Sequence, residues 1–217
     1  MKSLRILFAM FISLTSAFAT TLIPMDFQDL TAKAELIFIG TVIDIRSEKD
    51  IHTIYTHVTF ADLRVLKGSD PGATIEVRLS GGTVAGESVH VFGMPEFVVG
   101  EKNLIFLAGN TQFICPIVGW GQGRFKVRWD EVSRQEVVFD DRDVPVTEIR
   151  GREIVRARRT RNAKGSPGVP DRGQVVVREV QKQELETRLP LDSFVSAIET
   201  RMGIGSQLPG SGKAGVK

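Results

Sequence analysis

Apolar and polar side chains alternate along much of the chain between residues 36 and 139, a pattern typical of β-strands with one buried face. The clearest alternation is that of Ile75, Val77 and Leu79 with polar neighbours. The pattern predicts strands over 36–46, 51–66, 75–79, 89–92, 104–107, 113–118, 125–129 and 136–139, separated by turns.

Two positions interrupt this alternation. Gly40 lies inside the first predicted strand, where a glycine usually marks a bend or a close approach of another backbone. In the second strand the apolar residues change parity between Phe60 and Leu63. Because successive side chains point to opposite faces, we expect a β-bulge near Ala61 or Asp62.

Helical periodicity is confined to two short segments. Residues 25–34 are predicted to form a helix capped by Asp26, and a second helix is predicted from a cap at Asp192 to Gly203. We therefore predict a mainly β fold: a small antiparallel barrel of the OB type with a short N-terminal helix and a C-terminal helix. A β-sandwich is the alternative, whereas the lack of alternating βα units argues against a doubly wound α/β fold.

The first nineteen residues have the order of a secretory signal. Lys2 and Arg5 precede an apolar run over 6–14, and Ala17 and Ala19 provide the small residues that signal peptidase accepts. The run is too short to span a bilayer, and no later segment is long and apolar enough. We expect cleavage after Ala19 and an exported, periplasmic or extracellular protein.

Charge divides the mature chain into two parts. Residues 20–149 carry 12 basic and 19 acidic side chains, and residues 150–217 carry 14 basic and 7 acidic ones. A nucleic-acid-binding protein would be expected to have a basic folded domain, so this class is disfavoured. The predicted organisation is a signal peptide (1–19), a barrel (20–139), a basic Pro/Gly linker (140–173), a strand and helix (174–203) and a disordered tail (204–217).

Three segments, taken in order, resemble the netrin-like module, the OB-type barrel of the tissue inhibitors of metalloproteinases. They are residues 34–42 (AELIFIGTV), 65–68 (VLKG) and 100–107 (GEKNLIFL). The chain is still more similar to uncharacterised secreted bacterial proteins whose cores end in a motif like residues 119–125 (GWGQGRF). The resemblance covers roughly residues 25–139 and implies a binding domain that modulates a secreted protease, with a metalloprotease as partner.

The resemblance does not carry over the inhibitors' zinc-blocking residue, a mature N-terminal cysteine fixed by disulfides. Here the predicted first residue is Thr20, and Cys115 is the only cysteine. The predicted partner-binding residues are Thr20, Thr21, Trp120 and Arg124, with no cofactor. Trp120 lies in a glycine-rich turn and is either a plug over the end of the barrel or an exposed anchor for a partner.

Cys115 raises the alternative of a cell-envelope hydrolase, because a thiolate activated by a histidine is a nucleophile. The histidines are His52, His57 and His90, and their spacing gives this chemistry no support. Between Ile114 and Pro116 in a predicted strand, the thiol is better explained as a small buried apolar group.

No metal site is predicted. His52 and His57 are five residues apart on one predicted strand, which places them on opposite faces. The acidic run 140–143 lacks the ligand spacing of a calcium loop and is interpreted as a solvated turn.

A basic run follows the last predicted barrel strand. It is interpreted as a solvated linker, with contact to anionic envelope polymers or lipid headgroups as the alternative. Its basic residues are Arg150, Arg152, Arg156, Arg158, Arg159, Arg161 and Lys164. Because the packing signals are abundant and no coherent catalytic set emerges, the sequence favours an exported, non-enzymatic binding or accessory domain over a hydrolase.

Overall fold

The computed structural model describes residues 23–109, 114–157 and 188–203, and their regular structure is mainly β. The predicted signal peptide, residues 174–187 of the predicted 174–203 segment and the predicted tail lie outside the described residues. None of the helices within these ranges has the length and apolar character needed to span a membrane. The elements are α2 (Phe27–Lys33), β1 (Leu36–Lys49), β2 (Ile54–Lys67), β3 (Ile75–Ser80), β4 (Gly82–Val84), β5 (Glu87–Val89), β6 (Lys102–Leu107), the 3-10 helix η2 (Trp120–Gly123), β7 (Arg124–Asp130), β8 (Gln135–Asp140), β9 (Val146–Arg150), β10 (Glu153–Arg156) and α4 (Leu191–Arg201).

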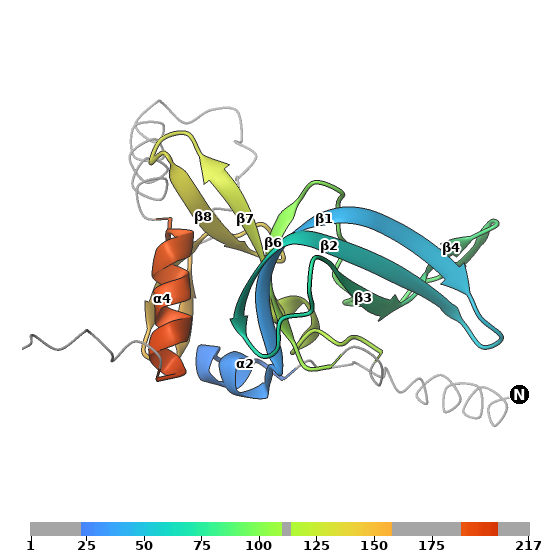
Figure 1. Cartoon of the computed structure of the whole chain (residues 1–217), viewed down its shortest axis with the longest axis horizontal. Coiled ribbons are helices and arrows are strands. Elements are labelled where there is room, and N and C mark those ends of the chain that lie inside the picture. Colours follow the sequence, from blue (N-terminus) through green and yellow to red (C-terminus); the bar gives the residue numbers. More distant parts are fainter. Residues whose placement is uncertain (1–22, 110–113, 158–187, 204–217) are drawn as a thin grey trace, which may run out of the picture.

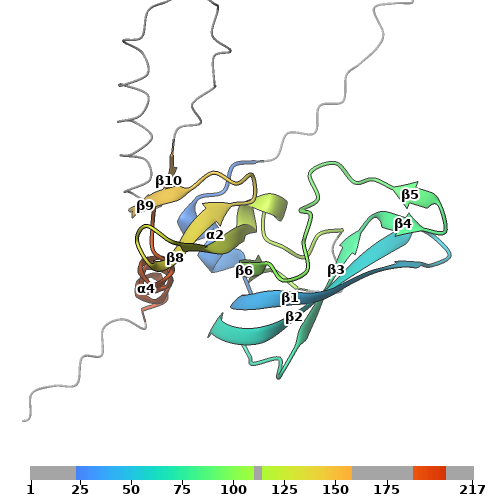
Figure 2. The same cartoon turned by 90° about the horizontal axis from the view of Figure 1, so that it is seen from above.

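A six-stranded antiparallel sheet forms the centre of the molecule, with the order β3-β2-β1-β6-β7-β8. Figure 1 shows β1 and β2 as a long, curved hairpin, with α2 and α4 near one end of it and β4 near the other. Figure 2 shows the small sheets, β4–β5 and β9–β10, toward opposite ends of the molecule. The mainly β, antiparallel prediction is confirmed.

The predicted bulge is confirmed in the pairing of β1 with β2. Ile39 pairs with Arg64 and Thr41 with Ala61, so Gly40 faces two residues, Asp62 and Leu63. A Cβ atom at Gly40 would lie 2.8 Å from the Leu63 side chain. The glycine thus admits the bulged strand, and the extra residue explains the change of parity in the sequence.

The prediction of a closed barrel is wrong, because β3 and β8 are the two edges of the sheet and do not pair with each other. The outer edge of β8 is instead bonded to the segment that precedes α4. The Val138 amide donates to the Leu189 carbonyl at 3.1 Å, and Val137 forms a bridge with Pro190. An edge strand has one row of unpaired backbone N–H and C=O groups. In β8 some of these groups bond to the segment before α4 and not to β3, so the sheet stays open.

The apolar face that closure would have buried is covered by α2, α4 and the β9–β10 hairpin. Phe194 of α4 lies with its ring centroid 5.6 Å from that of Phe27 on α2 and 4.9 Å from that of Phe125 on β7. All three side chains are fully buried in one cluster, which also contains Val146 and Ile154 of the hairpin. The fold therefore closes its core with helices and a hairpin on an open sheet.

The predicted linker is wrong over its first half, because residues 146–156 form the β9–β10 hairpin. The hairpin was not predicted because its two buried residues, Val146 and Ile154, are surrounded in the sequence by many charged residues. The predicted cap of the last helix is also wrong, because Pro190 is the N-cap and Asp192 lies in the first turn. Burial of Leu191 in the core places the start of α4 two residues earlier than predicted.

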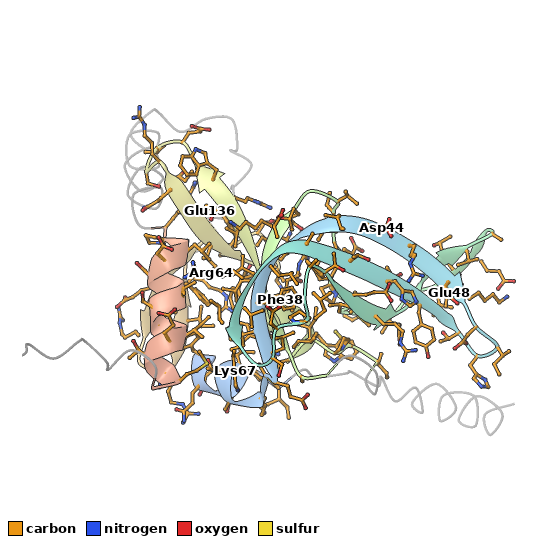
Figure 3. The ribbon with its side chains drawn as sticks, viewed as in Figure 1. Phe38, Asp44, Glu48, Arg64, Lys67 and Glu136 are labelled. Carbon is orange, nitrogen blue, oxygen red and sulfur yellow. The ribbon has the colours of Figure 1, made fainter. Side chains whose placement is uncertain are left out.

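Both ends of α2 are held by side chains. Asp26 caps its start as predicted, accepting from the Asp29 amide at 2.8 Å. Lys67, labelled in Figure 3 near α2, donates from Nζ to the carbonyls of Thr31 at 2.8 Å and Ala34 at 2.6 Å. A cation at this end also interacts favourably with the helix dipole.

Replacing Lys67 with Met should lower the free energy of unfolding by about 1.5–2 kcal/mol, because the variant loses charge-assisted hydrogen bonds to two helix-end carbonyls. Urea unfolding followed by circular dichroism measures the change. Lys33→Met is the matched control, since Lys33 is exposed in the last turn of the same helix. Equal losses in the two variants would contradict a specific role for Lys67.

Candidate functional site

A concavity lies at the end of the sheet that carries the β4–β5 hairpin. It has a volume of about 510 Å³, and its apolar side is formed by Ile45, Val58, Leu79 and Phe97. Val58 and Leu79 belong to a second cluster of buried apolar residues, which lies on the opposite face of the sheet from the helices and also contains Phe38, Phe60 and Cys115. We call this concavity the groove.

The polar side of the groove comes from β2, from β3 and from residues 82–96, which follow β3 and include the β4–β5 hairpin. Its hydrogen-bonding and charged side chains are Thr56, Ser80, Thr83, Ser88, His90 and Glu96. Several hydroxyls are already engaged: Thr83 and Ser88 lie 2.8 Å apart, and Thr56 donates to the Gly81 carbonyl at 2.8 Å. The groove therefore combines an apolar floor with a rim of polar side chains that includes the carboxylate of Glu96, the composition usual for binding sites.

Gly82 fixes the position of the β4–β5 hairpin over the sheet. Its φ is +138°, and a Cβ atom there would lie 2.5 Å from Thr56 Oγ1 and 2.7 Å from Ser47 Oγ. A side chain would both strain the backbone and separate the hairpin from β1 and β2. The groove is thus built into the fold at this glycine.

A tight turn beside the groove presents an aromatic ring to solvent. Val91 and Met94 line the groove, and the Met94 amide donates to the Val91 carbonyl at 3.2 Å, closing a turn through Gly93 at φ +83°. Phe92, between them, is 88% exposed. A large exposed aromatic on an ordered turn is the kind of residue that anchors protein interfaces.

Trp120 is half-buried and packs against the second cluster, so its ring covers part of the core of an open sheet and not the end of a barrel. The glycine-rich turn that contains Trp120 also holds the segment before α2, because the Gln122 side chain forms hydrogen bonds with the backbone of that segment. Gln122 Oε1 accepts from the Met25 amide at 2.8 Å, and Nε2 donates to the Ile23 carbonyl at 3.1 Å. Thr20 and Thr21 lie outside the described residues.

The prediction that Arg124 contacts a partner is wrong, because its side chain is only 1% exposed. The guanidinium donates to Glu101 at 2.5 Å, to Asp141 at 2.8 Å and to Asn103 at 2.9 Å. It also lies 4.2 Å from the ring centre of Phe97, a residue of the groove floor. Arg124 therefore holds the loop that carries Phe97. The alternation of residues in the sequence could not predict this burial, because Glu101 and Asp141 come from other parts of the chain.

Cys115 is buried in the second apolar cluster. This burial raises the pKa of its thiol to about 12. His57 Nδ1 is 2.7 Å from Glu76, and His52 and His90 are exposed, whereas Cys115 is buried. This setting favours the interpretation of Cys115 as a packing residue, because a nucleophile needs an accessible thiolate.

A soluble aromatic disulfide should label native Cys115 at pH 8 at least about a hundredfold more slowly than the urea-unfolded chain, because the folded thiol is buried and protonated. Because the pKa of the thiol is higher in the folded protein than its ordinary value of 9.0, the protonated thiol stabilises the fold at pH values below 9. This stabilisation should be lost as the pH rises from 9 toward 12. Cys115→Ala should lack this alkaline loss. Fast labelling of the native protein would contradict this placement.

The described arginines of the basic run are paired with acids. Arg150 bonds Glu148 at 2.6 Å, and Arg156 bonds Asp140 at 2.9 Å. Arg152 bonds the α2 cap, Asp26, at 2.6 Å. The Asp29 amide and then Arg152 lower the pKa of Asp26. Arg158, Arg159, Arg161 and Lys164 lie outside the described residues.

The acidic run 140–143 forms a turn whose carboxylates bond to other groups of the same chain. Asp140 accepts from the Val144 amide at 2.9 Å, Asp141 pairs with Arg124, and Asp143 pairs with Lys126 at 3.0 Å. The hydrogen bond from Lys126 is the main cause that lowers the pKa of Asp143. Within the described ranges, no group of three or more acidic, histidine or cysteine side chains is arranged to hold a metal ion.

Comparison of the chain with models of known protein families, with the curated proteins and with the solved structures finds no match.

Proposed function

We propose that this protein is an exported, non-enzymatic binding domain whose groove accepts an extended segment of a partner protein. The observation that carries the proposal is the groove itself, which joins an apolar floor to a rim bearing the 88% exposed Phe92. An apolar partner side chain would fill the floor, and Phe92 would pack against the partner's surface. The burial of Cys115 supports this function over the hydrolase alternative.

Modulation of a secreted metalloprotease is the most specific form of this proposal. It rests on the resemblance to the netrin-like module. The contacts of Gln122 with Ile23 and Met25 support it, because they hold the chain that follows the predicted mature N-terminus against the glycine-rich turn. A partner of this class would contact that turn as well as the groove.

Filling the groove should abolish binding without unfolding the protein. Ser88 lines the groove and is exposed, so Ser88→Trp would place a large ring in it. Glu87→Trp is the matched control, because Glu87 is also exposed on β5 and does not line the groove. Both variants should keep the circular dichroism spectrum of the wild type.

The test is affinity capture from the exported fraction of the source cells, read by quantitative mass spectrometry. The wild type and Glu87→Trp should recover the same protein, and Ser88→Trp should recover at least about tenfold less of it. A zinc protease as that protein would support the specific form. Equal recovery by the two Trp variants would overturn the groove as the binding site.

A further inference from the structure

A second exposed aromatic lies at the far end of the molecule from the groove. Trp129 is near the end of β7 and is 58% exposed. It shares a face of the sheet with Phe125 and Val127, because side chains alternate along a strand. These two neighbours are buried in the cluster that contains Phe194, whereas the indole of Trp129 is left largely open to solvent.

The indole forms one wall of a concavity of about 390 Å³. The β7–β8 hairpin contributes Arg134, Gln135 and Glu136, and the start of α4 contributes Pro190 and Asp192. Figure 3 shows Glu136 on this hairpin, beyond the end of α4. The site is separate from the groove in sequence and in position (Figure 1), and the following inference does not depend on the proposed function.

Two of the polar side chains of this concavity, Arg134 and Gln135, are available to bind a ligand. Within the described residues, the side chains of Arg134 and Gln135 make no hydrogen bond, and Asp192 is 93% exposed with only a 3.8 Å ion pair to Arg64. Glu136 is held in place by Lys102, which donates to its two oxygens at 2.7 and 2.8 Å. The concavity therefore offers donors, acceptors and an amide that does both.

We propose that this concavity binds a saccharide. A sugar ring has one face of C–H groups, which packs against an indole, and a rim of hydroxyls, which both donate and accept hydrogen bonds. The carboxylates of Glu136 and Asp192 disfavour a phosphate-bearing ligand, and the ionic rim disfavours an apolar peptide. A neutral sugar fits both the aromatic wall and the mixed polar groups.

The probes are cellotetraose and tri-N-acetylchitotriose, titrated into the mature full chain and followed by the indole N–H signal of Trp129 in ¹H–¹⁵N spectra. At least one should shift this signal saturably with a dissociation constant on the order of 1 mM, leaving the Trp120 signal unchanged. Trp129→Ala should weaken binding at least tenfold, measured by calorimetry, and Gln135→Ala should weaken it severalfold. Val132→Ala, at a 72% exposed apolar site on the same hairpin turn, should bind as the wild type does.

Failure of both sugars to shift the indole signal would overturn the proposal. So would undiminished binding by Trp129→Ala and Gln135→Ala. Because both residues are outside the core, folding of each variant is checked by its thermal midpoint, and Gln135→Ala carries the test if Trp129→Ala is unfolded. Loss of sugar binding in these variants should leave partner capture through the groove unchanged, which separates the two proposals.

Discussion

Arg124→Met should destabilise the protein by about 3–5 kcal/mol, one of the two largest effects we expect from a single substitution. The Arg124 side chain is 1% exposed and bonds Glu101, Asp141 and Asn103. Met fills most of the volume but leaves two carboxylates in the protein without their cation. Thermal unfolding should show a midpoint lowered by roughly 10 °C.

Neutralising an acid in the same background separates charge from packing. Arg124→Met combined with Glu101→Gln should recover part of the lost stability, because one unpaired carboxylate is removed. Arg150→Ala is the surface control, since Arg150 is exposed and paired only with Glu148, and its midpoint should stay at the wild-type value. A midpoint for Arg124→Met equal to that of the control would show that the network is not buried.

Phe194→Ala should cost about 3–5 kcal/mol, because it removes a buried ring and leaves a cavity between α4 and the sheet. Phe194 is fully buried and contacts the rings of Phe27 and Phe125. Urea unfolding should show a lower midpoint, with the helical signal and the sheet signal lost together. This coupling is expected because the helix replaces barrel closure as the cover of the sheet.

Ser193→Ala is the control for Phe194→Ala, since Ser193 is the exposed neighbour on the same helix. Its unfolding midpoint should match the wild type. A Phe194→Ala variant with the midpoint of Ser193→Ala would contradict the docking of α4. An α4 that melts before the sheet in the wild type would contradict it too.

The strands of the sheet could be predicted from the sequence because their alternation is set by one buried face. The pairing of Phe125–Trp129 with Glu136–Phe139 follows from two such patterns joined by a polar turn, and the structure has this hairpin as β7–β8. The bulge could also be predicted, since the parity change at Ala61 or Asp62 requires one extra residue in β2.

Closure of the sheet could not be predicted, because it depends on contacts between distant segments. Leu189 bonds Val138 over fifty residues away, and no local pattern reports which edge a returning segment will occupy. The β9–β10 hairpin was hidden for a different reason. Its two buried residues, Val146 and Ile154, stand among arginines and acids that suggest a solvated linker.

The candidate site was largely beyond sequence reasoning. Arg124 alternates with apolar Phe125, which predicts an exposed position, and its burial follows only from Glu101 and Asp141 arriving from other elements. The groove is assembled from three strands, a hairpin and a loop, so no motif marks it. Phe92 was a detectable signal: it is a bulky aromatic beside Gly93, in a segment whose predicted strand ends instead at Val89.

Site-specific photo-crosslinking in the source cells tests the central claim, binding through the groove, most directly. A benzophenone amino acid replaces Phe92 in one variant and Ile51, which is 92% exposed in the turn between β1 and β2 and does not line the groove, in another. The account predicts one protein crosslinked to position 92, lost on adding Ser88→Trp, and not crosslinked to position 51. The same product from both positions, or a crosslink at position 92 unaffected by Ser88→Trp, would contradict it.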